Sequence, residues 1–266
     1  MAHLGNVAQG VHSMGCGEKQ QDATNDRWLA GVDGYLSGWV IALVRPAGSE
    51  VRVRTVPHFA DLLVLPERPS VIAIDVPIGL PARSGGGARL AESTVRPLLG
   101  DRQSSLFSVP ARAAIYAGDY REACRLAVER SDPPRKVSKQ LYLIAPKIRE
   151  VDACLRTDAA LAQRVFEVHP ELAFWRLNGE RALTVPKKLK RRYYGPGLTL
   201  RRHLLIKAGF LAAAVEADPP KGAGADDLLD ALACAAMARR LHAGIARPFP
   251  DPPQRDAFGL PMAIWA

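Results

Sequence analysis

Two aspartates stand at the ends of apolar segments, where they could hold a divalent metal ion. Asp33 closes the segment 28–33, and Asp75 closes the segment 71–75, which is apolar except for that last residue. Clustered carboxylates repel one another unless a cation neutralises them, and Mg²⁺ and Mn²⁺ prefer oxygen ligands. Asp33 precedes Gly34 and could instead cap a turn through its own backbone. That structural alternative is weaker for Asp75, because a carboxylate closing an apolar strand is costly without a partner.

Three more aspartates open the segment 226–243, which has the clearest helical pattern of the chain. Asp227 and Asp230 are three residues apart and therefore face the same way on a helix. We expect this pair to complete a metal site with the first two aspartates. For Asp226 we prefer the role of helix cap. A solvated acidic first turn that favours the helix dipole is the alternative for the pair.

Glu167 and His169 form a third candidate cluster in the segment 164–169, which is predicted to be a strand. Their side chains share one face of that strand, because side chains alternate along it. Glu167 could complete the metal site or act as a base, and His169 could orient a water molecule or contact a phosphate. A single histidine on a strand is more often structural, so this alternative stays open.

The segment 187–194 carries five basic residues and two tyrosines. It could follow a phosphate backbone while the tyrosines stack on bases, or it could be an ordinary solvated loop. Arg201 adds to the basic excess, and the formal net charge of the chain is +9. Such a charge favours polyanionic partners, above all nucleic acid, although many basic proteins have no nucleic-acid function.

The elements that would position these residues begin with three predicted antiparallel strands. A helix then crosses over to a fourth strand, which should run parallel to the first. This opening differs from a Rossmann fold, where helix and strand alternate from the start, and it predicts an α/β RNase H-like mixed sheet. The predicted strands are 28–33, 39–45, 51–57, 71–75 and 164–169, and the predicted helices are 58–65, 136–157, 199–216 and 226–243.

The chain is predicted to contain one domain. Residues 1–27 are expected to be a mobile N-terminal extension, and residues 28–266 a single RNase H-like domain with an insertion of about residues 82–160. The four cysteines are far apart and form no CxxC pair, which fits a reducing cytoplasm. No apolar run is long enough for a membrane span.

Taken together, the motifs resemble those of the family called domain of unknown function 429, predicted RNase H-like nucleases. The matching stretches are GVDGYLSGW at 31–39, AIDVPIGLP at 73–81, the region 96–112, SKQLYLIAPKIREVD at 138–152, FEVHPELAF at 166–174, DDLLDALACAAMARR at 226–240 and the closing GLPMAIWA. Two departures stand out: Arg89-Leu90-Ala91-Glu92 replaces the family's Arg-x-Cys-Asp, and Tyr193-Tyr194 stands where the family is more polar. The resemblance implies an RNase H-like fold and an acidic site built from the aspartates above, with Glu167 close by.

The function expected from these observations is a metal-dependent nuclease that hydrolyses phosphodiesters with Mg²⁺ or Mn²⁺. Its expected catalytic residues are Asp33, Asp75, Glu167, Asp227 and Asp230, of which the four aspartates bind the metal. The expected substrate-binding residues are His169, Lys187, Lys188, Lys190 and Arg201. A non-catalytic nucleic-acid or protein binding module is the alternative, followed by a small-molecule phosphotransferase.

Overall fold

The protein is built around a five-stranded mixed sheet. The structure, a computed structural model, describes Met1 and residues 27–85, 89–190 and 192–266. The strands lie in the order β3-β2-β1-β4-β7, with bounds β1 Leu29–Tyr35, β2 Gly38–Val44, β3 Val51–Val56, β4 Val71–Ile74 and β7 Val165–Glu167. The first three are antiparallel, and β1, β4 and β7 are parallel. The predicted mixed α/β architecture is confirmed, whereas the predicted mobile extension lies almost entirely outside the described residues.

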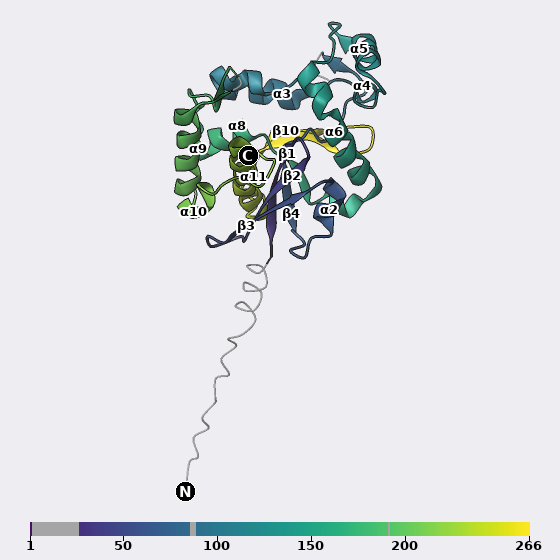
Figure 1. Cartoon of the computed structure of the whole chain (residues 1–266). Helices are drawn as coiled ribbons and strands as arrows, with labels where there is room; N and C mark the ends of the chain where they lie inside the picture. The colour runs from purple at the N-terminus through teal and green to yellow at the C-terminus, as the bar shows by residue number, and fades with distance from the viewer. Residues whose placement is uncertain (2–26, 86–88, 191) are drawn as a thin grey trace.

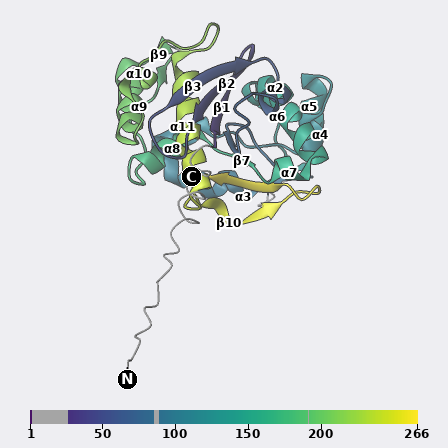
Figure 2. The same ribbon diagram turned by 90° about the horizontal axis from the view of Figure 1, so that it is seen from below.

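Helices cover both faces of the sheet, so the fold has three layers (Figures 1 and 2). On β2, Val40, Ala42 and Val44 belong to a core shared with α8 (Pro170–Leu177), α9 (Gly195–Lys207) and α11 (Ala225–His242). The intervening residues, Trp39 and Ile41 among them, pack in a second core with α2 (Phe59–Leu63) and α6 (Lys139–Thr157). Side chains alternate along a strand, and a central strand buried on both faces is therefore apolar throughout, as β2 is.

The closest contact between layers is that of α11 with β1. A Cβ atom on Gly31 would lie 2.0 Å from the backbone nitrogen of Ala235 and 2.1 Å from the carbonyl oxygen of Ala231. Only glycine allows the two backbones to approach this far. Ala231, Ala235 and Ala238 are fully buried and lie three or four residues apart, so they keep that face of the helix thin. This contact fixes the first turns of α11 relative to the end of β1.

A long connection separates the adjacent strands β4 and β7, in the region predicted as an insertion. It contains β5 (Ser84–Gly85), α3 (Leu90–Val95), the 3₁₀ segment η1 (Arg96–Ser105), α4 (Arg112–Ile115), α5 (Tyr120–Glu129), β6 (Ser131–Asp132), α6 and α7 (Ala159–Ala162). The short strands β5 and β6 pair in parallel and bring residues 84–85 beside 131–132. Residues distant in sequence therefore meet at one end of the molecule.

Beyond β7 the structure corrects the predicted elements in two places. The single helix predicted for 199–216 is wrong: α9 ends at Lys207, and α10 (Ala212–Val215) follows a turn at Gly209, whose φ of +93° interrupts the helix. The hairpin of β10 (Pro248–Arg255) and β11 (Pro261–Trp265) was not predicted, because β10 is rich in proline, which is rare in strands. The small hairpin of β8 (Lys188–Leu189) and β9 (Arg192–Tyr193) lies within the predicted basic segment.

Candidate functional site

Acidic side chains gather where β1, β4 and β7 end. The backbone N–H of Asp75 donates to the carbonyl of Val32 at 3.0 Å, which sets Asp75 beside Asp33. Both residues, together with Glu167 and His169, line a cavity of about 150 Å³. Parallel strands end at the same edge of a sheet, and ligands bind at that edge in open α/β sheets. The sheet order predicted from sequence therefore brings Asp33 and Asp75 together.

Burial and mutual repulsion raise the pKa values of this group. Burial, and then the charges of Asp230 and Asp75, raise the pKa of Asp33 well above its ordinary value. The pKa of Asp75 rises to about 8, chiefly through burial and then through Asp230. Burial also raises the pKa of Asp230 to about 6, although Lys187 opposes the change. Without a cation, Asp75 therefore keeps its proton at neutral pH, whereas Asp230 is mostly ionised beside Lys187.

Asp33 also forms a hydrogen bond with the neighbouring backbone, as the glycine after it in the sequence suggested. One carboxylate oxygen accepts a hydrogen bond from the backbone N–H of Gly34 at 2.9 Å. In the part of the chain that the structure describes, neither Asp33 nor Asp75 forms an ion pair. The contact with Gly34 leaves the second carboxylate oxygen of Asp33 available for a ligand.

Lysines from the basic segment reach the aspartates of α11. The ammonium of Lys187 forms a short ion pair with Asp230 and lies 3.7 Å from Asp226. Lys188 forms an ion pair with Asp226 at 2.6 Å. Burial alone would lower the pKa of Lys187, but the charges of Asp230 and Asp226 raise it. The basic segment therefore adjoins the acidic site, and Lys187 acts there as a counterion from the protein itself.

The first turn of α11 uses its aspartates differently from the prediction. Asp227, and not Asp226, caps the helix: its carboxylate accepts from the backbone N–H of Gly224 at 2.7 Å. The side chain of Asp226 is buried and forms ion pairs with Lys187 and Lys188 instead. The preferred capping role of Asp226 was therefore wrong. Asp226 and Asp230, four residues apart, share Lys187 as a partner.

Glu167 has a counterion of its own. Its carboxylate pairs closely with Arg89 and accepts from the backbone N–H of Ile78 at 2.7 Å. Burial raises the pKa of Glu167 to about 7, against the opposing charge of Arg89. Arg89 also pairs with Glu92, and Glu92 lines the cavity with Asp33 and Asp75. Arg89 and Glu92 were not among the predicted site residues, although Glu92, which stands where the family pattern has Asp, was a signal in the sequence.

The remaining predicted substrate-binding residues differ in how accessible they are. His169 lies at the start of α8, with Nε2 3.4 Å from the carbonyl of Ser105, and burial lowers its pKa to about 4. Arg201 is fully buried, and its guanidinium donates to Glu171 at 2.5 Å and to the carbonyl of Gly197 at 3.0 Å. Lys190 is exposed on the β8–β9 turn.

The oxygen-rich donor set suits Mg²⁺ or Mn²⁺. One oxygen of Asp230 and one of Asp226 are buried without a hydrogen-bond partner, and such orphaned acceptors are expected where an ion is to bind. Within the described residues, however, no three Asp, Glu, His or Cys side chains converge as a ready metal cage. Mg²⁺ usually keeps several waters and takes only one or two protein carboxylates. The residues therefore fit a largely hydrated ion.

Residues 31–255 match the family described as Protein of unknown function (DUF429). No curated protein and no solved structure gives a significant match to the chain. Within the described residues, no helix has the length and apolar character needed to cross a bilayer. The family match extends from the strand that carries Asp33 to the end of β10 and so includes every acidic residue of the site. The chain belongs to the DUF429 family.

Proposed function

We propose that this protein is a metal-dependent phosphodiesterase of RNase H-like fold that acts on nucleic acid. One observation carries the proposal: burial, and then the charge of Asp230 on α11, raise the pKa values of Asp33 and Asp75 on adjacent parallel strands. Strongly perturbed pKa values in a cleft are typical of functional sites. A divalent cation bound between these carboxylates would neutralise their mutual repulsion.

Asp33, Asp75 and Asp230 are the residues that would hold the metal ion, one or two of them directly and the rest through its water molecules. When bound, Mg²⁺ or Mn²⁺ supplies activation of a water molecule and stabilises the leaving oxygen. Glu167 lines the same cavity, and its pKa of about 7 suits a group that both takes up and releases a proton near neutral pH. The contact with Arg89 holds that carboxylate in one orientation.

His169 contributes a second polar group to the cavity. With a pKa of about 4 its imidazole is neutral at physiological pH, so it can accept or donate a hydrogen bond without repelling a cation. Its Nδ1 atom is buried without a partner. These features support a role in orienting a water molecule or a phosphate oxygen.

The test is cleavage of single-stranded, duplex, hybrid and branched substrates in the presence of Mg²⁺ or Mn²⁺. Asp33→Asn should abolish cleavage, because it removes a ligand charge while keeping the side-chain shape. Asp218→Asn is the matched control, since Asp218 is exposed on the loop after α10. Cleavage that persists in Asp33→Asn at the wild-type rate would refute the proposed function.

A second candidate function is non-catalytic binding of nucleic acid. The observation that favours it is the internal neutralisation of the acids, since Lys187 already pairs with Asp230 and Arg89 with Glu167. A binding module needs no metal ion. Nucleic-acid binding that is unaffected by Mn²⁺, in a protein whose melting temperature Mn²⁺ does not raise, would favour this candidate.

A further inference from the structure

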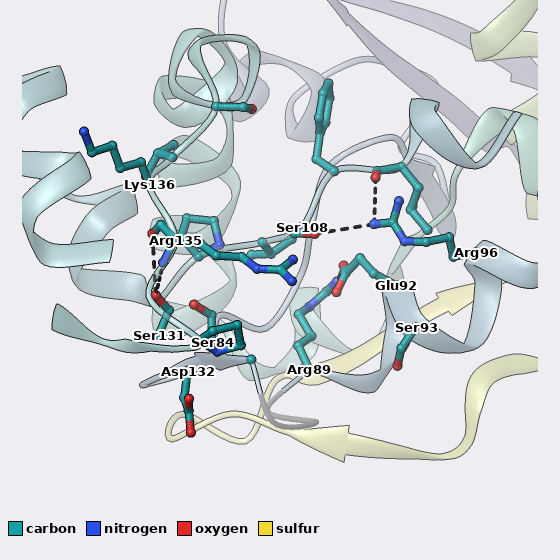
Figure 3. Close-up of a pocket in the computed structure, with 18 residues that line it drawn as sticks. Ser84, Arg89, Glu92, Ser93, Arg96, Ser108, Ser131, Asp132, Arg135 and Lys136 are labelled. Atoms are coloured by element: carbon teal, nitrogen blue, oxygen red, sulfur yellow. Dashed lines mark hydrogen bonds and ion pairs between the residues drawn. The ribbon is translucent and has the colours of Figure 1, made fainter. Parts of the chain in front are cut away.

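A larger cavity of about 560 Å³ adjoins the acidic one. Four residues line both: Glu92, Leu106, Phe107 and Val109. The wall of the larger cavity comes from β5, α3, the loop 106–110 and the loop 131–138 (Figure 3). The connection between β4 and β7 thus builds a second compartment whose inner wall is shared with the acidic site.

The larger cavity has a basic lining. Arg89, Arg96, Arg135 and Lys136 line it, against the two acids Glu92 and Asp132. Arg89 and Glu92 neutralise each other, and Arg96 donates to the carbonyls of Gln103 and Leu106 at 3.0 Å. The guanidinium groups of Arg89 and Arg96 therefore already have partners within the protein.

Arg135 and Lys136 are the cations left to meet a ligand. Both are exposed, and within the described part of the chain neither side chain forms an ion pair or hydrogen bond. Figure 3 shows Arg135 reaching into the cavity towards Arg89, while Lys136 lies at its rim. The hydroxyl of Ser131 fixes the loop that carries them, because it accepts from the backbone N–H of Arg135 at 2.7 Å. Unpaired cations on an ordered loop at a cavity suit an anionic group such as a phosphate.

Phe107 supplies an apolar surface at the junction of the two cavities. It is half-buried, and it lines both cavities together with Val109. Single-stranded nucleic acids are held by aromatic side chains that stack on bases and by cations that follow the phosphates. A volume of several hundred Å³ is typical of sites for small ligands. It suits a nucleotide unit, whereas stacked base pairs do not fit inside it.

We propose that the larger cavity binds the nucleotide next to the phosphodiester that is cleaved, and that the substrate is therefore a single strand or an unpaired end. Arg135 and Lys136 contact its phosphate, and Phe107 stacks on its base. This inference rests on the proposed function for the identity of the neighbouring phosphodiester. Binding of a single strand in the cavity can be measured without any cleavage.

The experiment measures fluorescence anisotropy of a short labelled oligothymidylate in EDTA, over a range of salt concentrations. The double variant Arg135→Gln/Lys136→Gln should bind at least about tenfold more weakly, and its salt slope should fall by about 1.4, for two lost phosphate contacts. Arg68→Gln/Lys207→Gln is the control of equal charge, because both residues are exposed and Arg68 precedes β4, at the opposite end of that strand. The control should retain affinity within about twofold of wild type.

Phe107→Leu tests stacking separately from charge. It should weaken single-strand binding by roughly tenfold while leaving the salt slope unchanged. A self-complementary duplex of similar length should be bound weakly by the wild type and should respond to neither set of substitutions. Melting curves establish that each variant is folded.

The outcomes separate this inference from the proposed function. Weaker binding by the double variant than by its control supports the inference even if no substrate is cleaved, and the nuclease assignment alone then fails. Equal binding by the double variant and its control overturns the inference, as does a wild type that binds no single strand. Duplex binding that depends on Arg135 and Lys136 overturns the single-strand assignment.

Discussion

At the scale of single residues, the ionisation of Asp75 should affect the stability of the fold. Its pKa of about 8 lies above the ordinary value of 3.8, so the folded protein binds the proton more tightly than the unfolded chain does. The stability that this proton contributes is complete below about pH 4 and is lost as the pH rises through about 8. Metal-free protein should therefore lose stability over this range.

Asp75→Asn should remove that part of the pH dependence. In EDTA, urea unfolding should show that the free energy of unfolding of the variant increases relative to that of wild type as the pH rises. The change should be on the order of 2 kcal/mol at about pH 9. Asp218→Asn serves as the control, because Asp218 is exposed. Parallel pH profiles for Asp75→Asn and wild type would contradict the raised pKa.

Lys187 is the residue whose role the structure alters most. As a substrate contact it would leave metal binding untouched when replaced, but its ion pairs with Asp230 and Asp226 give it a second role. Lys187→Gln should destabilise metal-free protein by about 2 kcal/mol, less than the loss of a fully buried pair costs. It should also increase the rise in melting temperature caused by Mn²⁺, because the ion no longer competes with an ammonium.

Lys190→Gln is the matched control for this prediction. Lys190 belongs to the same hairpin turn and is exposed. Its replacement should leave both the free energy of unfolding and the Mn²⁺ effect at their wild-type values. An Mn²⁺ effect that disappears in Lys187→Gln would instead mean that Lys187 holds the carboxylates in place for the ion.

At the scale of elements, two aspartates at the start of α11 have different roles: Asp227 caps the helix, and Asp230 is a proposed metal ligand. Asp227 accepts from the N–H of Gly224, whereas Asp230 faces Lys187. Asp227→Ala should lower the free energy of unfolding by about 1 kcal/mol through the lost cap and should keep the Mn²⁺-induced rise in melting temperature. Asp230→Asn should abolish that rise. The opposite pattern in differential scanning fluorimetry would assign the ligand to Asp227.

The contact between α11 and β1 is the second element-scale test. Gly31→Ala places a methyl group about 2 Å from two backbone atoms that cannot move independently, so the helix must shift away from the strand. We expect a loss of about 3 kcal/mol or more, together with a weaker Mn²⁺ effect, because Asp230 moves with α11. Gly195→Ala is the control, since among the described residues no atom outside its chain neighbours and its own helix backbone lies within 4 Å of the added methyl group. Equal melting temperatures for the two variants would exclude this tight contact.

The sequence predicted the elements that carry the site better than the contacts within it. Apolar periodicity located β1, β4 and α11 to within one or two residues, because these elements are buried over most of their length. The partners of the aspartates could not be predicted. Lys187 and Asp230 are 43 positions apart, with the β8–β9 hairpin, α9 and α10 between them, and local patterns carry no information about such a contact.

The same limit applies to the larger cavity. Its lining joins residues of 84–110 with residues of 131–138, which the pairing of β5 with β6 places side by side. From the sequence, this region was predicted as part of an insertion of about residues 82–160. Two-residue strands have too little periodicity to be predicted from sequence, so neither the cavity nor the role of Arg135 followed from the pattern.

At the scale of the whole molecule, the net charge and the acidic site act on a nucleic acid in opposite directions. The chain carries a formal charge of +9, which attracts phosphates from a distance. Once ionised, the carboxyl groups at the ends of β1 and β4 repel the same phosphates at close range until a cation is present. Binding and cleavage should therefore respond differently to the removal of one acidic charge.

Asp33→Asn is the variant that should separate the two. Measured by anisotropy in EDTA, its affinity for a single strand should equal that of wild type where Asp33 is protonated, and should exceed it at a pH where Asp33 is ionised, because one repelling charge is then gone. The slope of log K against log salt should stay unchanged, since that slope counts phosphate contacts with cations and Asp33 makes none. In Mn²⁺ the same variant should cleave nothing. A loss of affinity in EDTA would instead mean that the contact of Asp33 with Gly34 holds the binding surface in shape, and this aspartate would then act through the fold rather than through the metal ion.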